Sequence, residues 1–350
     1  MTDWPTRNKA ALAPLREAMV DFEPGAVRAA LKAVIAPDAV VHMAHPFGDL
    51  TGPDALFETC YGPLFQAMPD LERRDWIVIA GPDEGGNQWV GCAGHYLGSF
   101  LGPWLDIPPT GHLTHMRFHE FYRFEGGKVV EVQAIWDIPE VMMQAGAWPM
   151  VPSLGREFRV PGPASQDGIV PGPWDAEAAR TSQQTIIDML AHMIRHPSQG
   201  GPEVMEMPRF WHERMTWYGP AGIGTARGVA GFRHWHQIPF LAAMPDRGQH
   251  EDAVTHHFFG DGAYAAVTGW PNMLQTVTGD GWLGIAPAGQ RISLRSLDFW
   301  RLERGRIREN WVLIDLLDVY RQLGVDVFAR MRAFNKARVP GRISLSEEPA

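Results

Sequence analysis

The sequence predicts an α+β protein made of two tandem cone-shaped domains, each a curved antiparallel sheet wrapped by N-terminal helices around a pocket. Three observations support this fold class: an internal repeat with a period of about 177 residues, helical spacing followed by strand spacing within each repeat, and a segment rich in proline and glycine between the repeats. The composition agrees, because 45% hydrophobic and 20% charged residues over 350 positions are typical of a chain that buries substantial cores.

The repeat is visible in short motifs that return at a nearly constant offset. Met-Pro-Asp at residues 68–70 returns at residues 244–246, an offset of 176. The sequence FYRFE at residues 121–125 returns as FWRLE at residues 299–303, an offset of 178. A period this long indicates two homologous domains, because solenoid repeats have periods of roughly 20–50 residues.

Domain boundaries follow from the repeat. We expect a first copy over residues 1–146 and a second copy over residues 176–335. Residues 147–175 are rich in proline and glycine and have no sustained period, so we predict that they form a linker. Residues 336–350 are predicted to be a C-terminal tail.

The spacing of apolar residues in the first copy predicts helices before strands. Glu23-Pro24 suits a helix start, and Gly126-Gly127 marks a turn between two strands. We expect helices over 6–20, 25–35, 52–66 and 139–144, and strands over 40–43, 76–80, 89–96, 113–124 and 129–137.

The second copy repeats the order. Its expected helices cover 178–195 and 229–242, and its expected strands cover 251–258, 262–270, 291–302 and 306–315. Helices followed by an antiparallel meander are typical of α+β folds, and a strongly curved sheet of this kind would enclose a pocket.

Charge and cysteine content exclude several classes of protein. A net charge of −9 argues against a nucleic-acid partner, because binding to phosphates requires a basic surface. No run of about 18 apolar residues predicts a membrane helix, and the first residues resemble no secretory signal, so we expect a cytoplasmic protein with no membrane partner. Two cysteines exclude a disulfide scaffold.

The C-terminal part of each copy carries a resemblance. The sequence RLERGRIRENWVLID at 301–315, followed by LLDVYRQLG at 316–324, resembles the SnoaL-like polyketide cyclase family of the nuclear-transport-factor-2-like superfamily. The resemblance covers about 35–146 and 210–330. It implies an acid/base aspartate at Asp315 and Asp137, ring closure similar to an intramolecular aldol step, and no metal or organic cofactor.

Strand alternation adds a second carboxylate. Asp298 lies on a mostly apolar face of the predicted strand 291–302, and an apolar pocket raises the pKa of a carboxyl group toward neutral pH. We therefore predict Asp315 as general acid/base assisted by Asp298, with Asp137 and Glu120 at the matching positions of the first copy. The alternative is that Asp315 only caps the helix that follows it.

Aromatic and polar residues near these carboxylates are candidates for substrate binding: Tyr218, Trp270, Arg295, Trp300, Trp311, His42, His95 and Tyr122. The histidines of the first copy fall on both faces of the predicted strands, so we expect no metal site. No nucleotide-binding glycine pattern is present, so we expect no cofactor.

These expectations predict a cofactor-independent cyclase, isomerase or hydro-lyase acting on an apolar or aromatic polyketide-like small molecule. The alternatives are a non-catalytic small-molecule-binding protein and a structural module whose duplication only builds an interface. Because single-copy relatives pair through their sheets, the resemblance also implies an intrachain pseudo-dimer of the two copies. Assembly of several chains into a further homo-oligomer is compatible with this arrangement.

Overall fold

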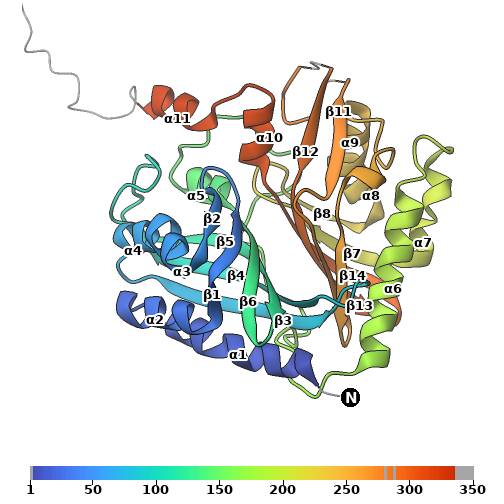
Figure 1. Ribbon diagram of the computed structural model, residues 1–350. Helices are drawn as coiled ribbons and strands as arrows, with labels where there is room; N and C mark the ends of the chain where they lie inside the picture. The colour runs from blue at the N-terminus through green and yellow to red at the C-terminus, as the bar shows by residue number, and fades with distance from the viewer. Residues whose placement is uncertain (1–2, 280–281, 287–288, 336–350) are drawn as a thin grey trace, which may run out of the picture.

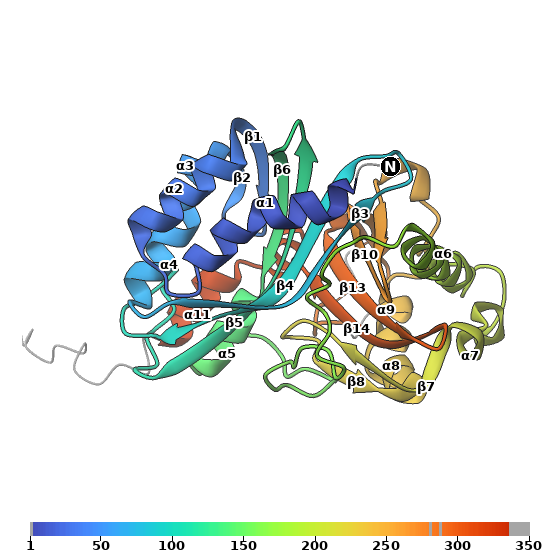
Figure 2. The ribbon, with the colours of Figure 1, turned by 90° about the horizontal axis from the view of Figure 1, so that it is seen from below.

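A computed structural model describes residues 3–279, 282–286 and 289–335. It confirms the α+β fold class and the tandem arrangement: two similar halves each place helices before a curved six-stranded sheet. Copy one runs from α1 to α5 and copy two from α6 to α11. In both ribbon views the two sheets face each other in the middle of the molecule, and most of the helices lie on the outer sides (Figures 1 and 2).

Copy one begins with two capped helices. The side chain of Asp3 accepts the Thr6 N–H at the start of α1, and that of Glu23 accepts the N–H groups of Gly25 and Ala26 at the start of α2. The helical elements are α1 (Trp4–Ala18), α2 (Pro24–Val34), α3 (Gly52–Leu56), the π-helical turn η1 (Phe57–Tyr61), α4 (Gly62–Ala67) and α5 (Ile138–Gln144). The strands are β1 (Ile35–Met43), β2 (Gly48–Thr51), β3 (Glu72–Pro82), β4 (Gln88–Ser99), β5 (Leu113–Glu125) and β6 (Lys128–Trp136).

The sheet of copy one has the order β2-β1-β6-β5-β4-β3. Four neighbouring pairs are antiparallel, as expected, but β1 pairs with β6 in parallel. The last strand of the meander, β6, follows β5 by a hairpin and lies beside β1. The parallel neighbours β1 and β6 are far apart in the chain, because β2, the helices α3 and α4 and the strands β3 to β5 come between them.

Copy two repeats this plan and adds several short helical elements and a separate pair of strands. Its helical elements are α6 (Ala176–Met193), η2 (Pro202–Met205), α7 (Met207–Phe210), α8 (Gly228–Phe232), the π-helical turn η3 (Arg233–Gln237), α9 (Ile238–Ala243), η4 (Glu251–Ala253), α10 (Leu316–Gln322) and α11 (Val327–Asn335). The strands are β7 (Trp211–Tyr218), β8 (Thr225–Arg227), β9 (His257–Asp261), β10 (Tyr264–Thr268), β11 (Met273–Val277), β12 (Gln290–Leu294), β13 (Ser296–Glu303) and β14 (Arg306–Ile314).

Two expected strands of copy two differ from the structure. The expected strand 251–258 is mostly a 3-10 turn and loop, and the strand β9 starts only at His257. The expected strand 291–302 is divided at Arg295, because β12 pairs with β11 in a separate two-stranded sheet while β13 joins the order β8-β7-β14-β13-β10-β9. Sequence alternation continues through this break, so it did not reveal the change of partner.

Side chains from both sheets share one buried cluster between the copies. Phe121 of β5 stacks on Phe299 of β13 with ring centroids 4.9 Å apart. Gly81 of β3 lies against Gly260 of β9, where a Cβ atom on Gly81 would come within 2.6 Å of the Gly260 carbonyl oxygen. At the edge of this contact, Lys9 of α1 forms an ion pair with Asp261 of β9. The facing sheets are therefore held by packing as well as by charge.

Residues 145–175 join the copies without forming a helix or a strand of their own. Isolated bridges connect Ile169 to Val78 of copy one and Arg156 to Thr225 of copy two. Tail residues 336–350 lie outside the described residues. Within the described part of the chain, none of the helices has the length and apolarity needed to span a membrane.

Candidate active site

A cavity of about 280 Å³ lies inside copy two, between the concave face of β13 and β14 and the helical elements α6, η3 and α9. Its walls are mostly apolar and aromatic. They include Met193, Trp211, Trp217, Phe232, Phe240 and Trp300. Ligand pockets commonly combine such walls with a few polar groups that fix orientation.

Two carboxylate residues line this cavity, Glu251 of η4 and Asp298 of β13. Ser296, two residues earlier on the same strand face, donates its hydroxyl hydrogen to Asp298 Oδ1 at 2.5 Å, and both residues line the cavity. No other hydrogen bond reaches the side-chain carboxylate of Asp298 from the described residues, so Oδ2 remains available. Burial raises the pKa of Asp298 to about 7, against the opposing effects of the Ser296 hydrogen bond and the charges of Arg117 and Arg247.

Several polar atoms of the cavity wall have no partner. The indole N–H groups of Trp211 and Trp300, Nδ1 of His236 and Oε1 of Gln275 are buried and make no hydrogen bond to any described residue. Burial, together with the nearby charge of Arg247, lowers the pKa of His236 to about 3, so its imidazole is neutral at physiological pH. Buried polar groups are normally paired, and these atoms are therefore ready to bind a polar ligand.

The corresponding interior of copy one is filled. Glu120, which matches Asp298, accepts hydrogen bonds from Arg73 at 2.5 Å, from Tyr122 at 2.6 Å and from Tyr96 at 2.8 Å. The indole of Trp136 donates a further bond at 2.9 Å. These side chains are at most 2% exposed. Glu120 and Tyr122, both expected to act on substrate, are thus saturated members of a closed network.

Among the described residues, two substitutions between the copies account for the space that copy two keeps open around Asp298. Trp136, whose indole reaches Glu120, is matched by Ile314 at the offset of 178. Tyr61, which packs against Trp136 with ring centroids 5.3 Å apart, is matched by Gln237 at the offset of 176. Ile314 and Gln237 both line the cavity.

The structure places Asp315 and Asp137 at the boundary between the copies. The carboxylate of Asp315 accepts the backbone N–H groups of His45 and Asp318 at 2.9 and 3.2 Å. Asp137 accepts the backbone N–H of Ala221 at 3.0 Å. Burial raises the pKa of Asp315 to about 6 and that of Asp137 to about 7. Neither residue lines the cavity that holds Asp298.

Five other candidates lie at this boundary as well. Trp311 and Tyr218 stack on each other in the cluster between the sheets. Trp311 points away from the cavity because the residues on either side of it in β14, Asn310 and Val312, line the cavity. Trp270 stacks on His42 of copy one with ring centroids 5.7 Å apart. Arg295 lies 4.7 Å from the Trp270 ring and bonds to Asp315. Of the predicted binding residues, Trp300 is the one that lines the cavity.

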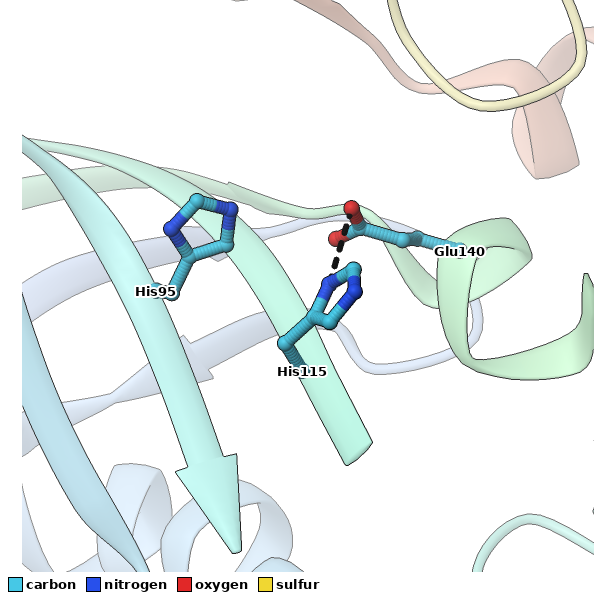
Figure 3. Close-up of side chains that lie close together, drawn as sticks. All are labelled: His95, His115 and Glu140. Carbon is cyan, nitrogen blue, oxygen red and sulfur yellow. Dashed lines mark ion pairs between the residues drawn. The ribbon is translucent and has the colours of Figure 1, made fainter. Parts of the chain in front are cut away.

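His95 belongs to a cluster with His115 and Glu140, on β4, β5 and α5 (Figure 3). One potential metal-ligand atom of each residue lies within 4.8 Å of the others, and His115 Nδ1 is 3.1 Å from Glu140. Two histidines and a carboxylate are a ligand set that could hold a divalent metal ion.

A neighbouring tryptophan opposes this use. Trp76 donates its indole N–H to His95 Nδ1 at 3.2 Å. The Nδ1 atom must then be unprotonated, so the proton of neutral His95 resides on Nε2, which faces the other two side chains in Figure 3. A metal-bound histidine needs the opposite tautomer, with Nδ1–H as donor. Burial lowers the pKa of His95 to about 3 and keeps it neutral.

Sequence reasoning missed Ser296, Gln275, His236, Arg247 and Glu140. The first four line the cavity of copy two. One signal was present for Arg247, which directly follows the repeated Met-Pro-Asp motif and matches the buried Leu71 of copy one. A second signal was present for Ser296, which shares the strand face of Asp298 by alternation. The remaining three come from separate elements, whose convergence no single motif records.

Comparisons with known proteins give one matching family model and a set of similar solved structures. The family model of the SnoaL-like polyketide cyclases matches residues 13–145 and 202–323. Among solved structures, a putative SnoaL-like polyketide cyclase from Jannaschia sp. CCS1 is 20% identical, with a TM-score of 0.37, over 42% of this chain and 96% of its own. IdmH, a putative polyketide cyclase from Streptomyces antibioticus, is 22% identical, with a TM-score of 0.34, over 40% of this chain and 99% of its own. Comparison with curated proteins gives no match.

Proposed function

We propose that this chain, which belongs to the SnoaL-like polyketide cyclase family, performs cofactor-independent acid/base chemistry in the cavity of copy two, with Asp298 as the general acid/base. The substrate class is an apolar or aromatic polyketide-like small molecule, and the reaction is of the cyclase, isomerase or hydro-lyase type. The observation that carries the proposal is a carboxylate with one free oxygen, a pKa near neutrality and mostly apolar surroundings.

The geometry suits proton transfer at a carbon next to a carbonyl group. Ionised Asp298 would take that proton through Oδ2, while the hydroxyl of Ser296 holds Oδ1. The unpaired indole N–H groups of Trp211 or Trp300 would donate to the substrate oxygen that becomes negative. Protonated Asp298 would then return the proton at the end of the step. This cycle uses side chains of copy two only.

The family resemblance favours a different assignment, with Asp315 and Asp137 as acid/base residues. Their pKa values are also raised. Their oxygens already accept backbone N–H groups of the other copy, and they lie outside the cavity. We therefore propose that both aspartates join the copies, and that Asp298 carries the chemistry.

A proton-exchange assay tests the assignment without knowledge of the natural substrate. The probe is 2-tetralone in deuterated buffer, an enolisable two-ring ketone whose α-protons are followed by NMR. We expect exchange faster than in buffer alone, and a loss of about 10²–10⁴-fold in Asp298→Asn. Asp315→Asn is the matched control and should retain exchange per mole of folded protein.

Two outcomes would contradict the proposal. If Asp315→Asn removes exchange while Asp298→Asn does not, the family assignment is right and ours is wrong. If the wild-type protein and Asp298→Asn bind 2-tetralone equally in calorimetry and neither accelerates exchange, the chain is a non-catalytic binding protein, which is the alternative function.

A further inference from the structure

We propose that the ligand of the copy-two cavity carries a carboxylate and that Arg247 binds it. This inference rests on the proposed function, because it concerns the same cavity, but it adds the charge and chemical class of the ligand. Arg247 lines the cavity together with Asp298 and the aromatic walls.

Arg247 is a cation without a protein partner. It forms no hydrogen bond and no ion pair with any described residue, whereas Arg73 in copy one is paired with Glu120 and Asp75 and Arg301 in copy two is paired with Glu309. Burial lowers the pKa of Arg247 to about 10, which still leaves the guanidinium charged at neutral pH. Glu251 and Asp298 raise the pKa of Arg247 through their charges, but neither forms an ion pair with it. A largely desolvated guanidinium without a hydrogen-bonded anion is costly, so an anionic ligand would offset that cost.

The position of Arg247 is fixed by the residue before it. Asp246 accepts the backbone N–H of Thr276 with both carboxylate oxygens, at 3.0 and 2.9 Å. Asp70 makes the matching contact in copy one, where it accepts the Ser99 N–H at 2.6 Å. The next residue is Leu71, which is buried in the core of copy one. Copy two thus presents a guanidinium at a position where copy one packs an aliphatic side chain.

The surroundings favour a single carboxylate over a phosphate. A planar guanidinium binds a carboxylate through two parallel hydrogen bonds. Glu251 and Asp298 also line the cavity, and their negative charges would disfavour a dianion. The remaining walls are mostly aromatic and aliphatic, and a volume of about 280 Å³ suits a molecule of one to three rings. The predicted ligand is therefore an aromatic or alicyclic carboxylic acid.

A matched pair of probes tests this inference. We would measure binding of 2-naphthoate and its neutral isostere 2-naphthamide to the full-length protein by calorimetry at low ionic strength. We expect the acid to bind at least about tenfold more tightly than the amide. Arg247→Gln should bring the ratio close to one without changing the affinity for the amide, and Arg247→Lys should restore part of the preference. Arg209→Gln, which removes an exposed cation outside the cavity, should keep the wild-type ratio.

Three results would overturn the inference: equal binding of acid and amide by the wild type, a preference that survives in Arg247→Gln, or no binding of either probe. Equal binding of acid and amide would mean that Arg247 binds no carboxylate of the free ligand and at most stabilises charge that develops during a reaction. Asp298→Asn separates this test from that of the proposed function. If it keeps the preference for the acid while the wild type shows no proton exchange, Arg247 binds carboxylates in a non-catalytic protein.

Discussion

Asp315 in copy two accepts the backbone N–H of His45 in copy one at 2.9 Å. The reverse contact also exists, since Asp137 in copy one accepts the N–H of Ala221 in copy two at 3.0 Å. His45 and Ala221 are matched by the offset of 176, and the two aspartates by the offset of 178. Each copy therefore holds the other through the same pair of positions, which is the pattern of an approximate two-fold axis.

The first prediction follows from these reciprocal contacts. Asp315→Ala and Asp137→Ala should each lower the free energy of unfolding by about 1–3 kcal/mol, because each leaves a backbone N–H of the other copy, partly buried at His45 and buried at Ala221, without its acceptor. Denaturant unfolding of the single and double variants measures this loss. Exchange of 2-tetralone per mole of folded protein should stay close to the wild-type rate. A stable Asp315→Ala variant without exchange activity would instead identify Asp315 as the acid/base.

The second prediction concerns the pairing of the copies within one chain, which we propose as an intrachain pseudo-dimer. The cluster between the sheets contains Trp89, Phe121, Phe299 and Trp311, all fully buried. Separate expression of residues 1–150 and 175–350 would expose these side chains, so we expect aggregation of each half or reassociation of both. Light scattering and size-exclusion chromatography report the outcome. Two soluble, folded monomers that ignore each other would argue against the pairing.

The third prediction is a pH dependence of stability. Burial raises the pKa of Asp298 from 3.8 to about 7, so the folded state holds this proton more tightly than the unfolded chain does. The resulting stability is fully present below about pH 4 and is lost as the pH rises through about 7. Asp137 and Asp315 act in the same direction.

A single variant isolates the contribution of Asp298. The difference in unfolding free energy between Asp298→Asn and the wild type should shift in favour of the variant by at most about 4 kcal/mol between pH 4 and pH 8. Urea unfolding at several pH values gives this difference. Glu213→Gln, on an exposed carboxylate, is the control against which the shift of Asp298→Asn is measured. A flat line for Asp298→Asn relative to this control would mean that its carboxyl group titrates normally.

The sequence was sufficient for the fold and insufficient for the site. Repeated motifs and alternating strands predict the tandem α+β fold, because both depend on local periodicity. Alternation could not say which face of β14 looks into the cavity. Both faces are buried, Trp311 against the other copy and Val312 toward the cavity, so no polar face distinguishes them.

The difference between the two interiors also lies beyond sequence periodicity. Tyr61, Tyr96, Tyr122 and Trp136 come from four elements and meet only around Glu120. Matching the copies residue by residue would have paired Trp136 with Ile314 and Leu71 with Arg247. Those two pairs indicate an opened, charged interior in copy two, but only once it is known that all four positions face inward.

The fourth prediction concerns the cluster of His95, His115 and Glu140. Because the Trp76 indole donates to His95 Nδ1, the wild-type protein should bind Zn²⁺ weakly in calorimetry. Trp76→Phe frees Nδ1 to carry the proton and should bind Zn²⁺ at least about tenfold more tightly, and adding His95→Ala to that variant should remove the gain. Stoichiometric zinc in the purified wild type, lost in His95→Ala, would show that the cluster is a metal site despite Trp76.

The last prediction exchanges one residue between the two interiors. Ile314→Trp introduces into copy two the side chain that copy one has at Trp136. Both positions are the last residue of the matching strand, β14 in copy two and β6 in copy one, so the indole has a precedent at this place in the fold. The indole should enter the cavity beside Asp298, because Ile314 lines it. We expect a folded protein that no longer binds 2-tetralone or 2-naphthoate.

The reverse change, Trp136→Ile, removes a buried ring and one hydrogen bond to Glu120, and should cost about 3–5 kcal/mol of unfolding free energy. Melting temperatures and calorimetric titrations of both variants check the pair. Ligand binding that survives in well-folded Ile314→Trp would place the binding site outside this cavity.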